Sequence, residues 1–82
     1  MYPKGTRVII IKGFFCSEEA YTLAEKKGIK HYKPSGTVVY SNTFEHRVKL
    51  DQPLFPSPIV TMLLMEDLQI ITPKNINKKT NN

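Results

Sequence analysis

The chain lacks tryptophan and contains a single cysteine, Cys16, among its 82 residues. One cysteine cannot form an internal disulfide, which excludes the disulfide frameworks that stabilise many small secreted domains. The longest apolar runs are Val8–Ile11 and Met62–Met65, whereas a membrane-spanning helix needs roughly 20 apolar residues. The opening stretch MYPKGTRV also lacks the apolar region and cleavage site of a signal peptide. These absences predict a cytoplasmic protein with no membrane segment.

Much of the net positive charge of the chain lies in its C-terminal tail. The formal net charge of the chain is +5, but residues 73–82 carry Lys74, Lys78 and Lys79 with no acid. Residues 1–72 therefore carry about +2, which is too little for overall charge to indicate nucleic-acid binding. We expect residues 1–72 to form one domain and the polar, basic tail 73–82 to be disordered.

Hydrophobic periodicity predicts five strands and one short helix. The run Val8–Ile11 is β-branched throughout, which favours a buried strand. In FFCSEEAYTLAEKKGI, Ser17 can cap a helix of about ten residues over roughly 18–27, and Gly28 can end it in the left-handed conformation. The predicted strands are Thr6–Lys12, Thr37–Ser41, His46–Asp51, Ile59–Met65 and Leu68–Ile71.

The inward-facing side chains of these strands should form one core. In HRVKLD the alternation is clean, with Val48 and Leu50 inward and Arg47, Lys49 and Asp51 outward. The predicted core residues are Val8, Ile10, Val38, Val48, Leu50, Val60, Leu64 and Ile70.

Three segments carry a family resemblance: GTRVIIIKG at residues 5–13, SGTVV at 35–39 and RVKLD at 47–51. Together they resemble the KOW-type branch of the SH3-like small β-barrels, in which Gly36 would match the family's central glycine. The resemblance covers about residues 4–72 and implies a mainly β, five-stranded SH3-like barrel, here with one short helix inserted between strands one and two. It also implies a ribosomal, transcriptional or other nucleic-acid-associated role, although barrels of this kind serve many functions.

The basic loop KKGIKHYK at residues 26–33 is the strongest candidate for a binding site. Binding a phosphate backbone requires several cations near neighbouring phosphates, and an aromatic ring among them can stack on an unpaired base. The outward face of the third predicted strand would extend this patch, with His46 beside it. The alternative is a solvated helix end whose lysines complement the helix dipole. The predicted nucleic-acid-binding residues are Lys26, Lys27, Lys30, His31, Tyr32, Lys33, Arg47 and Lys49.

Residue spacing gives no support to catalysis or to a metal site. Cys16, His31 and His46 match neither C-x-x-C nor H-x-x-x-H spacing. A cysteine–histidine nucleophile would further need an orienting group and a formed pocket, and no glycine-rich phosphate loop is present. The lack of tryptophan argues against a proline-binding groove. We therefore expect a protein that is not an enzyme and that needs no cofactor or metal.

Two functional hypotheses are the main ones, and a structural subunit of a larger assembly is a third. The favoured one is a binding module that associates with nucleic acid or with a nucleic-acid-bound protein complex such as a polymerase or a ribosome. The alternative is a protein–protein interaction module that uses the helix face or the edge strand near FPSPIV, without nucleic-acid contact. One contiguous basic face would favour the first hypothesis, and an apolar patch of several hundred Å² the second.

Overall fold

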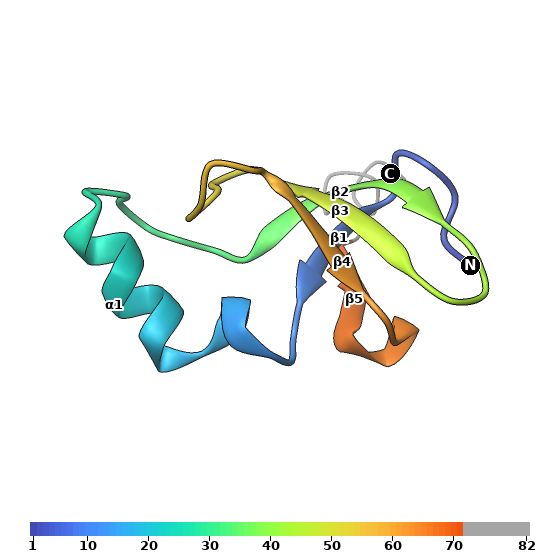
Figure 1. The fold of residues 1–82 in the computed structure, drawn as a ribbon, viewed down its shortest axis with the longest axis horizontal. Coiled ribbons are helices and arrows are strands. Elements are labelled where there is room, and N and C mark those ends of the chain that lie inside the picture. Colours follow the sequence, from blue (N-terminus) through green and yellow to red (C-terminus); the bar gives the residue numbers. More distant parts are fainter. Residues whose placement is uncertain (72–82) are drawn as a thin grey trace, which may run out of the picture.

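The computed structural model describes residues 1–71, and residues 72–82, which include the predicted tail, lie outside the described part. Within the described residues, one α-helix lies to one side of a twisted sheet (Figure 1). The strands are β1 (Arg7–Ile10), β2 (Ser35–Ser41), β3 (His46–Leu50), β4 (Ile59–Met62) and β5 (Leu68–Ile70); the helices are η1 (Phe14–Cys16), α1 (Glu18–Lys26) and η2 (Met65–Asp67). Within residues 1–71 no helix has the length and apolar character needed to cross a membrane.

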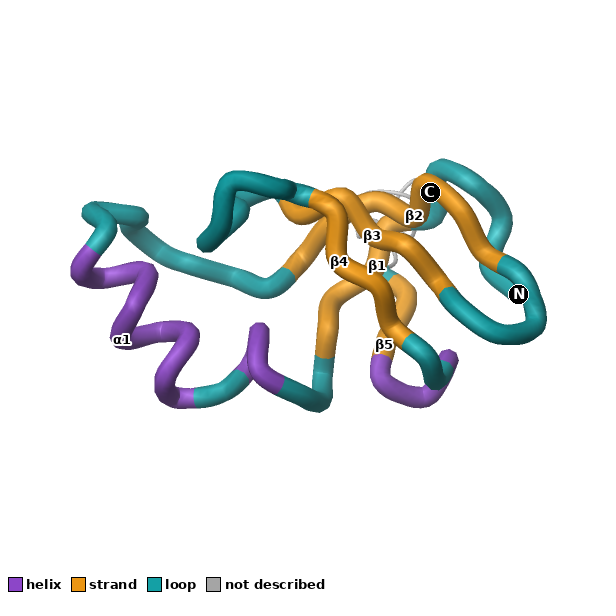
Figure 2. Tube along the Cα trace, viewed as in Figure 1, coloured by secondary structure: helices purple, strands orange, loops and turns teal. Residues whose placement is uncertain are grey.

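The five strands form one antiparallel sheet in the order β4-β3-β2-β1-β5. This confirms the predicted mainly β fold with one short helix between the first two strands (Figure 2). The strands β4 and β5 lie at the two margins, and no ladder joins them in the described residues. The sheet is therefore open along these margins.

The main core lies on one face of this sheet. Five of the predicted core residues are buried: Val8, Ile10, Val38, Val48 and Leu50. The predicted Val60 is partly buried and packs against them. Leu68 and the partly buried Met62, which were not predicted, complete this core.

Two predicted core positions are wrong: Leu64 is 52 % exposed and Ile70 is 55 % exposed. Strand β4 ends at Met62, so the alternation that would have turned Leu64 inward stops before it. Ile70 pairs with Val8 but is the last residue of a margin strand, and within residues 1–71 no strand pairs with the other side of that margin.

A second, smaller core lies under the helix. Ala20 and Ala24 face the buried Tyr32 and Leu54, and the small alanine side chains let α1 approach this cluster closely. Leu54 comes from the proline-rich loop after β3. A helix of nine residues is too short to be stable alone, so this contact is what holds α1 in place.

The helix begins and ends as its sequence predicts. The side chain of Ser17 accepts a hydrogen bond from the Ala20 amide at 3.3 Å, which satisfies one of the free N–H groups of the first turn. Gly28 has φ 78°, its amide donates to the Glu25 carbonyl at 3.0 Å, and the Ile29 amide donates to the Ala24 carbonyl at 2.9 Å. This pair of bonds is a Schellman motif, and it directs the following loop back toward the sheet.

Candidate nucleic-acid interface

The loop after α1 is fastened to the end of β3 by one side chain, Gln52. The Lys33 amide donates to Gln52 Oε1 at 2.8 Å, and Gln52 Nε2 donates to the Lys30 carbonyl at 3.2 Å. At the end of the loop, the Pro34 carbonyl accepts from the Ile10 amide at 2.8 Å. The predicted basic loop is therefore held against the sheet at two points.

His31 has a positive φ of 56°, a left-handed conformation that is uncommon for a residue other than glycine. Its side chain is exposed, whereas the side chain of the next residue, Tyr32, is buried. Such a conformation costs on the order of 1 kcal/mol or more and persists only where the surrounding contacts hold it. Here Gln52 bonds to the backbone on both sides of His31.

Tyr32 does not offer the stacking face that its sequence position suggests. Its side chain is only 7 % exposed, its hydroxyl donates to the Phe15 carbonyl at 2.7 Å, and its ring meets Tyr21 edge to face at 5.0 Å between centroids. Burial, followed by the nearby Tyr21 and Cys16, raises the pKa of Tyr32 to about 12. Tyr32 belongs to the core beneath the helix, although it also lines the hollow beside α1, and little of its ring is accessible for the predicted stacking.

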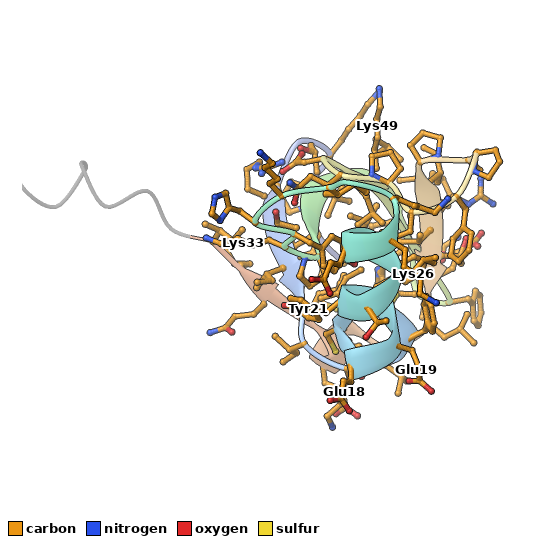
Figure 3. The ribbon with its side chains drawn as sticks, turned by 90° about the vertical axis from the view of Figure 1, so that its left-hand side faces the viewer. Glu18, Glu19, Tyr21, Lys26, Lys33 and Lys49 are labelled. Atoms are coloured by element: carbon orange, nitrogen blue, oxygen red, sulfur yellow. The ribbon has the colours of Figure 1, made fainter. Side chains whose placement is uncertain are left out.

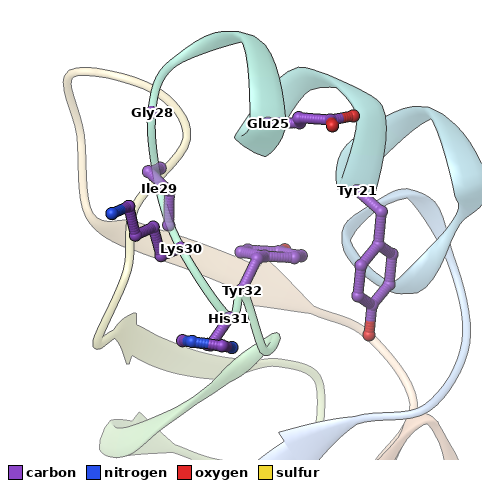
Figure 4. A pocket seen from close by; sticks show the side chains of 7 residues that line it. All are labelled: Tyr21, Glu25, Gly28, Ile29, Lys30, His31 and Tyr32. Carbon is purple, nitrogen blue, oxygen red and sulfur yellow. The ribbon is translucent and has the colours of Figure 1, made fainter.

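The accessible aromatic ring beside the loop is that of Tyr21, not that of Tyr32. It projects from α1, is 46 % exposed, and lines an open hollow of about 670 Å³ between the helix and the loop (Figure 4). Lys30 and His31 line the loop side of the hollow and Glu25 lines the helix side. The hollow thus combines an accessible aromatic ring with the side chains of a lysine and a histidine on one wall.

The lysines of the loop are exposed, and so is Lys49 on β3. Among the described residues, none of Lys26, Lys27, Lys30, Lys33 and Lys49 forms an ion pair. In Figure 3, which looks onto the helix, Lys49 lies at the top, Lys33 and Lys26 lie at mid-height on either side of the helix, and Glu18 and Glu19 lie at the lower end. Positive charge is therefore concentrated toward the C-terminal end of α1.

Arg47 faces outward together with Lys49, as the alternation predicts. Its guanidinium bonds the Glu45 carboxylate at 2.8 Å and lies over the Tyr40 ring, 4.9 Å from the centroid. Glu45 therefore offsets much of the charge that Arg47 would offer to a phosphate.

A β-bulge positions the aromatic partner of Arg47. Pairing between β2 and β3 shifts register between Val38 and Tyr40. Regular alternation would put Tyr40 on the same face as the buried Val38, whereas the extra residue turns Tyr40 outward opposite Arg47.

His46 does not extend the basic patch. It is buried, and its Nδ1 lies 2.6 Å from Ser41 Oγ. The other arginine of the sheet, Arg7, pairs with Asp51 through two parallel bonds, of which Nη1 to Oδ1 is 2.9 Å. The hydrogen bonds from Arg7 hold the pKa of Asp51 below its usual value, and Asp51 raises the pKa of Arg7.

Three contributors to this region were missed by the sequence interpretation: Tyr21, Tyr40 and Gln52. Tyr21 follows Ala20 and lies beside the apolar stripe of the helix rather than on it. This position is the one feature of the sequence that indicates an exposed ring. Tyr40 depends on a bulge and Gln52 on a contact between distant segments, neither of which has a local sequence signature.

The described residues contain no group of three or more histidine, cysteine or acidic side chains arranged to hold a metal ion. Comparisons of this chain with protein families, with curated proteins and with solved structures found no match.

Proposed function

We propose that this chain is a non-enzymatic cytoplasmic module that binds nucleic acid at the loop after α1. The phosphate backbone would contact Lys30, Lys33 and Lys49, with Lys26 and Lys27 extending the surface along the helix end. An unpaired base would enter the hollow and pack against the exposed ring of Tyr21.

One observation carries this proposal: within the described residues, the exposed lysines of the loop and of β3 form no ion pair, whereas both arginines do. Unpaired cations bind phosphates by releasing the counterions of the nucleic acid. Lysine ammonium groups suit this task because they act as point charges on flexible stems. An aromatic ring beside such cations adds about 1–3 kcal/mol per stacked base.

Fluorescence anisotropy with a labelled single-stranded oligonucleotide, repeated at several salt concentrations, tests the proposal. The double substitution Lys30→Gln and Lys33→Gln should weaken binding and reduce the salt slope by about 1.4, because each phosphate that is no longer neutralised lowers the slope by roughly 0.7. The matched control is Lys4→Gln with Lys12→Gln, which removes the same charge from exposed lysines outside the loop. If the control weakened binding as much as the loop variant, net charge alone would explain the binding, and the loop would not be a specific site.

Tyr21→Ala separates stacking from charge. It should weaken binding to single-stranded more than to double-stranded oligonucleotide, because only an unpaired base can reach the ring. Lys30→Gln with Lys33→Gln should weaken both. If Tyr21→Ala changed neither, the hollow would have no part in binding.

A protein partner is the second candidate, and the aromatic cluster of Phe14, Phe15 and Phe55 favours it. The three rings lie 5.4–6.1 Å apart between centroids, and Phe14 and Phe55 are both exposed. Exposed aromatic side chains are typical anchors of protein interfaces. Loss of partner binding in Phe55→Ser, with normal oligonucleotide binding, would favour this second function.

A further inference from the structure

The outer margin of β4 has backbone groups that point away from the sheet. The Leu50 amide donates to the Pro58 carbonyl at 2.9 Å, and Val60 and Met62 pair with Val48 and His46. Because bonding alternates along an antiparallel strand, Pro58, Val60 and Met62 direct their backbone hydrogen-bonding groups toward β3. Ile59 and Thr61 therefore direct their N–H and C=O groups toward the open margin.

Only a weak local contact occupies this margin among the described residues. Ser57 Oγ accepts from the Ile59 amide at 3.3 Å and donates to the Ile59 carbonyl at 3.5 Å. Both distances are at the long end of the hydrogen-bond range, and the side chain of Ser57 can rotate away. No backbone partner outside β3 engages Thr61 within residues 1–71.

The margin also lacks the charges that usually protect an edge strand. Residues 52–65 contain no acidic or basic side chain, and the outward Ile59 and Thr61 are both exposed. Edge strands in monomeric proteins commonly carry lysine or another charge that prevents strand addition. An uncharged, β-branched edge is suited to pairing with another strand of the same kind.

We infer that this margin pairs with β4 of a second copy of the chain. In an antiparallel arrangement with Val60 on the two-fold axis, Ile59 lies opposite Thr61 of the second copy and Thr61 opposite its Ile59. All the outward backbone groups are then used, in about four hydrogen bonds. The same pairing places β-branched side chains directly across from one another, which stabilises a sheet.

Charge favours a second copy over a charged partner strand. Two-fold pairing brings identical residues near each other, so an edge with charges would repel itself, and this edge has none. Lys49, which forms no ion pair within the described residues, lies across from Ile59 on β3. With strands about 4.8 Å apart, the two Lys49 residues would be about 16 Å from each other. That distance exceeds the Debye length of about 10 Å at 0.1 M salt, so repulsion is screened.

The pairing has a consequence for the outer face of the sheet. A two-fold axis perpendicular to the sheet keeps the outward faces of both copies on the same side. Lys49 from each copy would then belong to one continuous surface. The inferred dimer does not depend on the proposed nucleic-acid binding, because its contacts involve only the margin of β4.

Sedimentation velocity over a concentration series from about 10 µM to about 500 µM tests the inference, since small interfaces associate weakly. The wild-type chain should shift from monomer to dimer over this range. Thr61→Pro removes the outward N–H, which the fold does not use, and should raise the dissociation constant at least ten-fold. Thr61→Lys should do the same by placing a charge on the edge.

Two further variants act as controls. Thr61→Val keeps the β-branched shape and the backbone N–H, so it should dimerise like the wild type. Ser57→Ala removes the competing local contact and should tighten the dimer. A wild-type chain that stays monomeric throughout the series contradicts the inference, and so does a Thr61→Lys variant that dimerises as strongly as the wild type. Circular dichroism melts establish that each variant is folded.

Discussion

Replacing Gly36 by alanine should destabilise the sheet by an amount that the structure allows to be estimated. Gly36 is buried on β2 opposite Leu50. A Cβ added there would overlap the Lys49 carbonyl oxygen and lie 2.9 Å from Val48 Cγ1. The backbone of β3 would have to move away, disturbing the pairing that positions the buried Val48 and Leu50. Overpacking of this kind costs about 1–3 kcal/mol, and more when backbone must shift.

Gly28→Ala is the matched comparison, because it makes the same chemical change for a different reason. Gly28 has open space around it but a φ of 78°, so alanine there carries only the left-handed penalty of about 1–2 kcal/mol. Urea unfolding followed by circular dichroism should therefore give Gly36→Ala the larger decrease in stability, about 3 kcal/mol. Since a small domain has roughly 5–15 kcal/mol of stability, the difference is measurable. If Gly36→Ala cost no more than Gly28→Ala, the close approach of β2 and β3 at this position would be refuted.

The remaining predictions concern the two cores. Leu50→Ala should lower the free energy of unfolding by about 2–4 kcal/mol, whereas Leu64→Ala, the same change at an exposed site, should lower it by less than about 0.5 kcal/mol; equal decreases would mean that Leu64 is buried. The pKa of Tyr32 is raised to about 12 in the folded chain, so the unfolded chain loses this proton first as pH rises. Stability should consequently fall between about pH 10 and pH 12, by up to about 3 kcal/mol. Tyr32→Phe should lack this decrease in pH-dependent urea unfolding, and an unchanged profile in that variant would contradict the burial of the phenol.

Local chemistry made the helix predictable. Ser17, Gly28 and the alanines at 20 and 24 each act within one or two turns, and the structure has all of them in the expected roles. Strand alternation gave the inward residues of β3 for the same reason. A period of two needs only a few neighbouring residues to be recognised.

The errors arose where contacts between distant segments decide the outcome. Tyr32 reads as part of a polar loop, yet the helix covers it and the Phe15 carbonyl accepts a hydrogen bond from its hydroxyl. The end of β4 at Met62 was missed because the apolar run continues to Met65. In the basic loop, sequence identified the lysines, but Gln52, which fastens the loop to the sheet, becomes visible only in the fold.

Binding at the loop after α1 is tested most directly by a two-dimensional ¹H–¹⁵N NMR titration with a short single-stranded oligonucleotide at about 50 mM salt, where phosphate contacts are strong. We expect the amide shifts to concentrate at residues 26–33 and 47–52, with Tyr21 among the affected positions. We also expect the shifts to shrink as salt is raised. Spectra that do not change, or changes confined to β4 and η2, would contradict nucleic-acid binding at this loop.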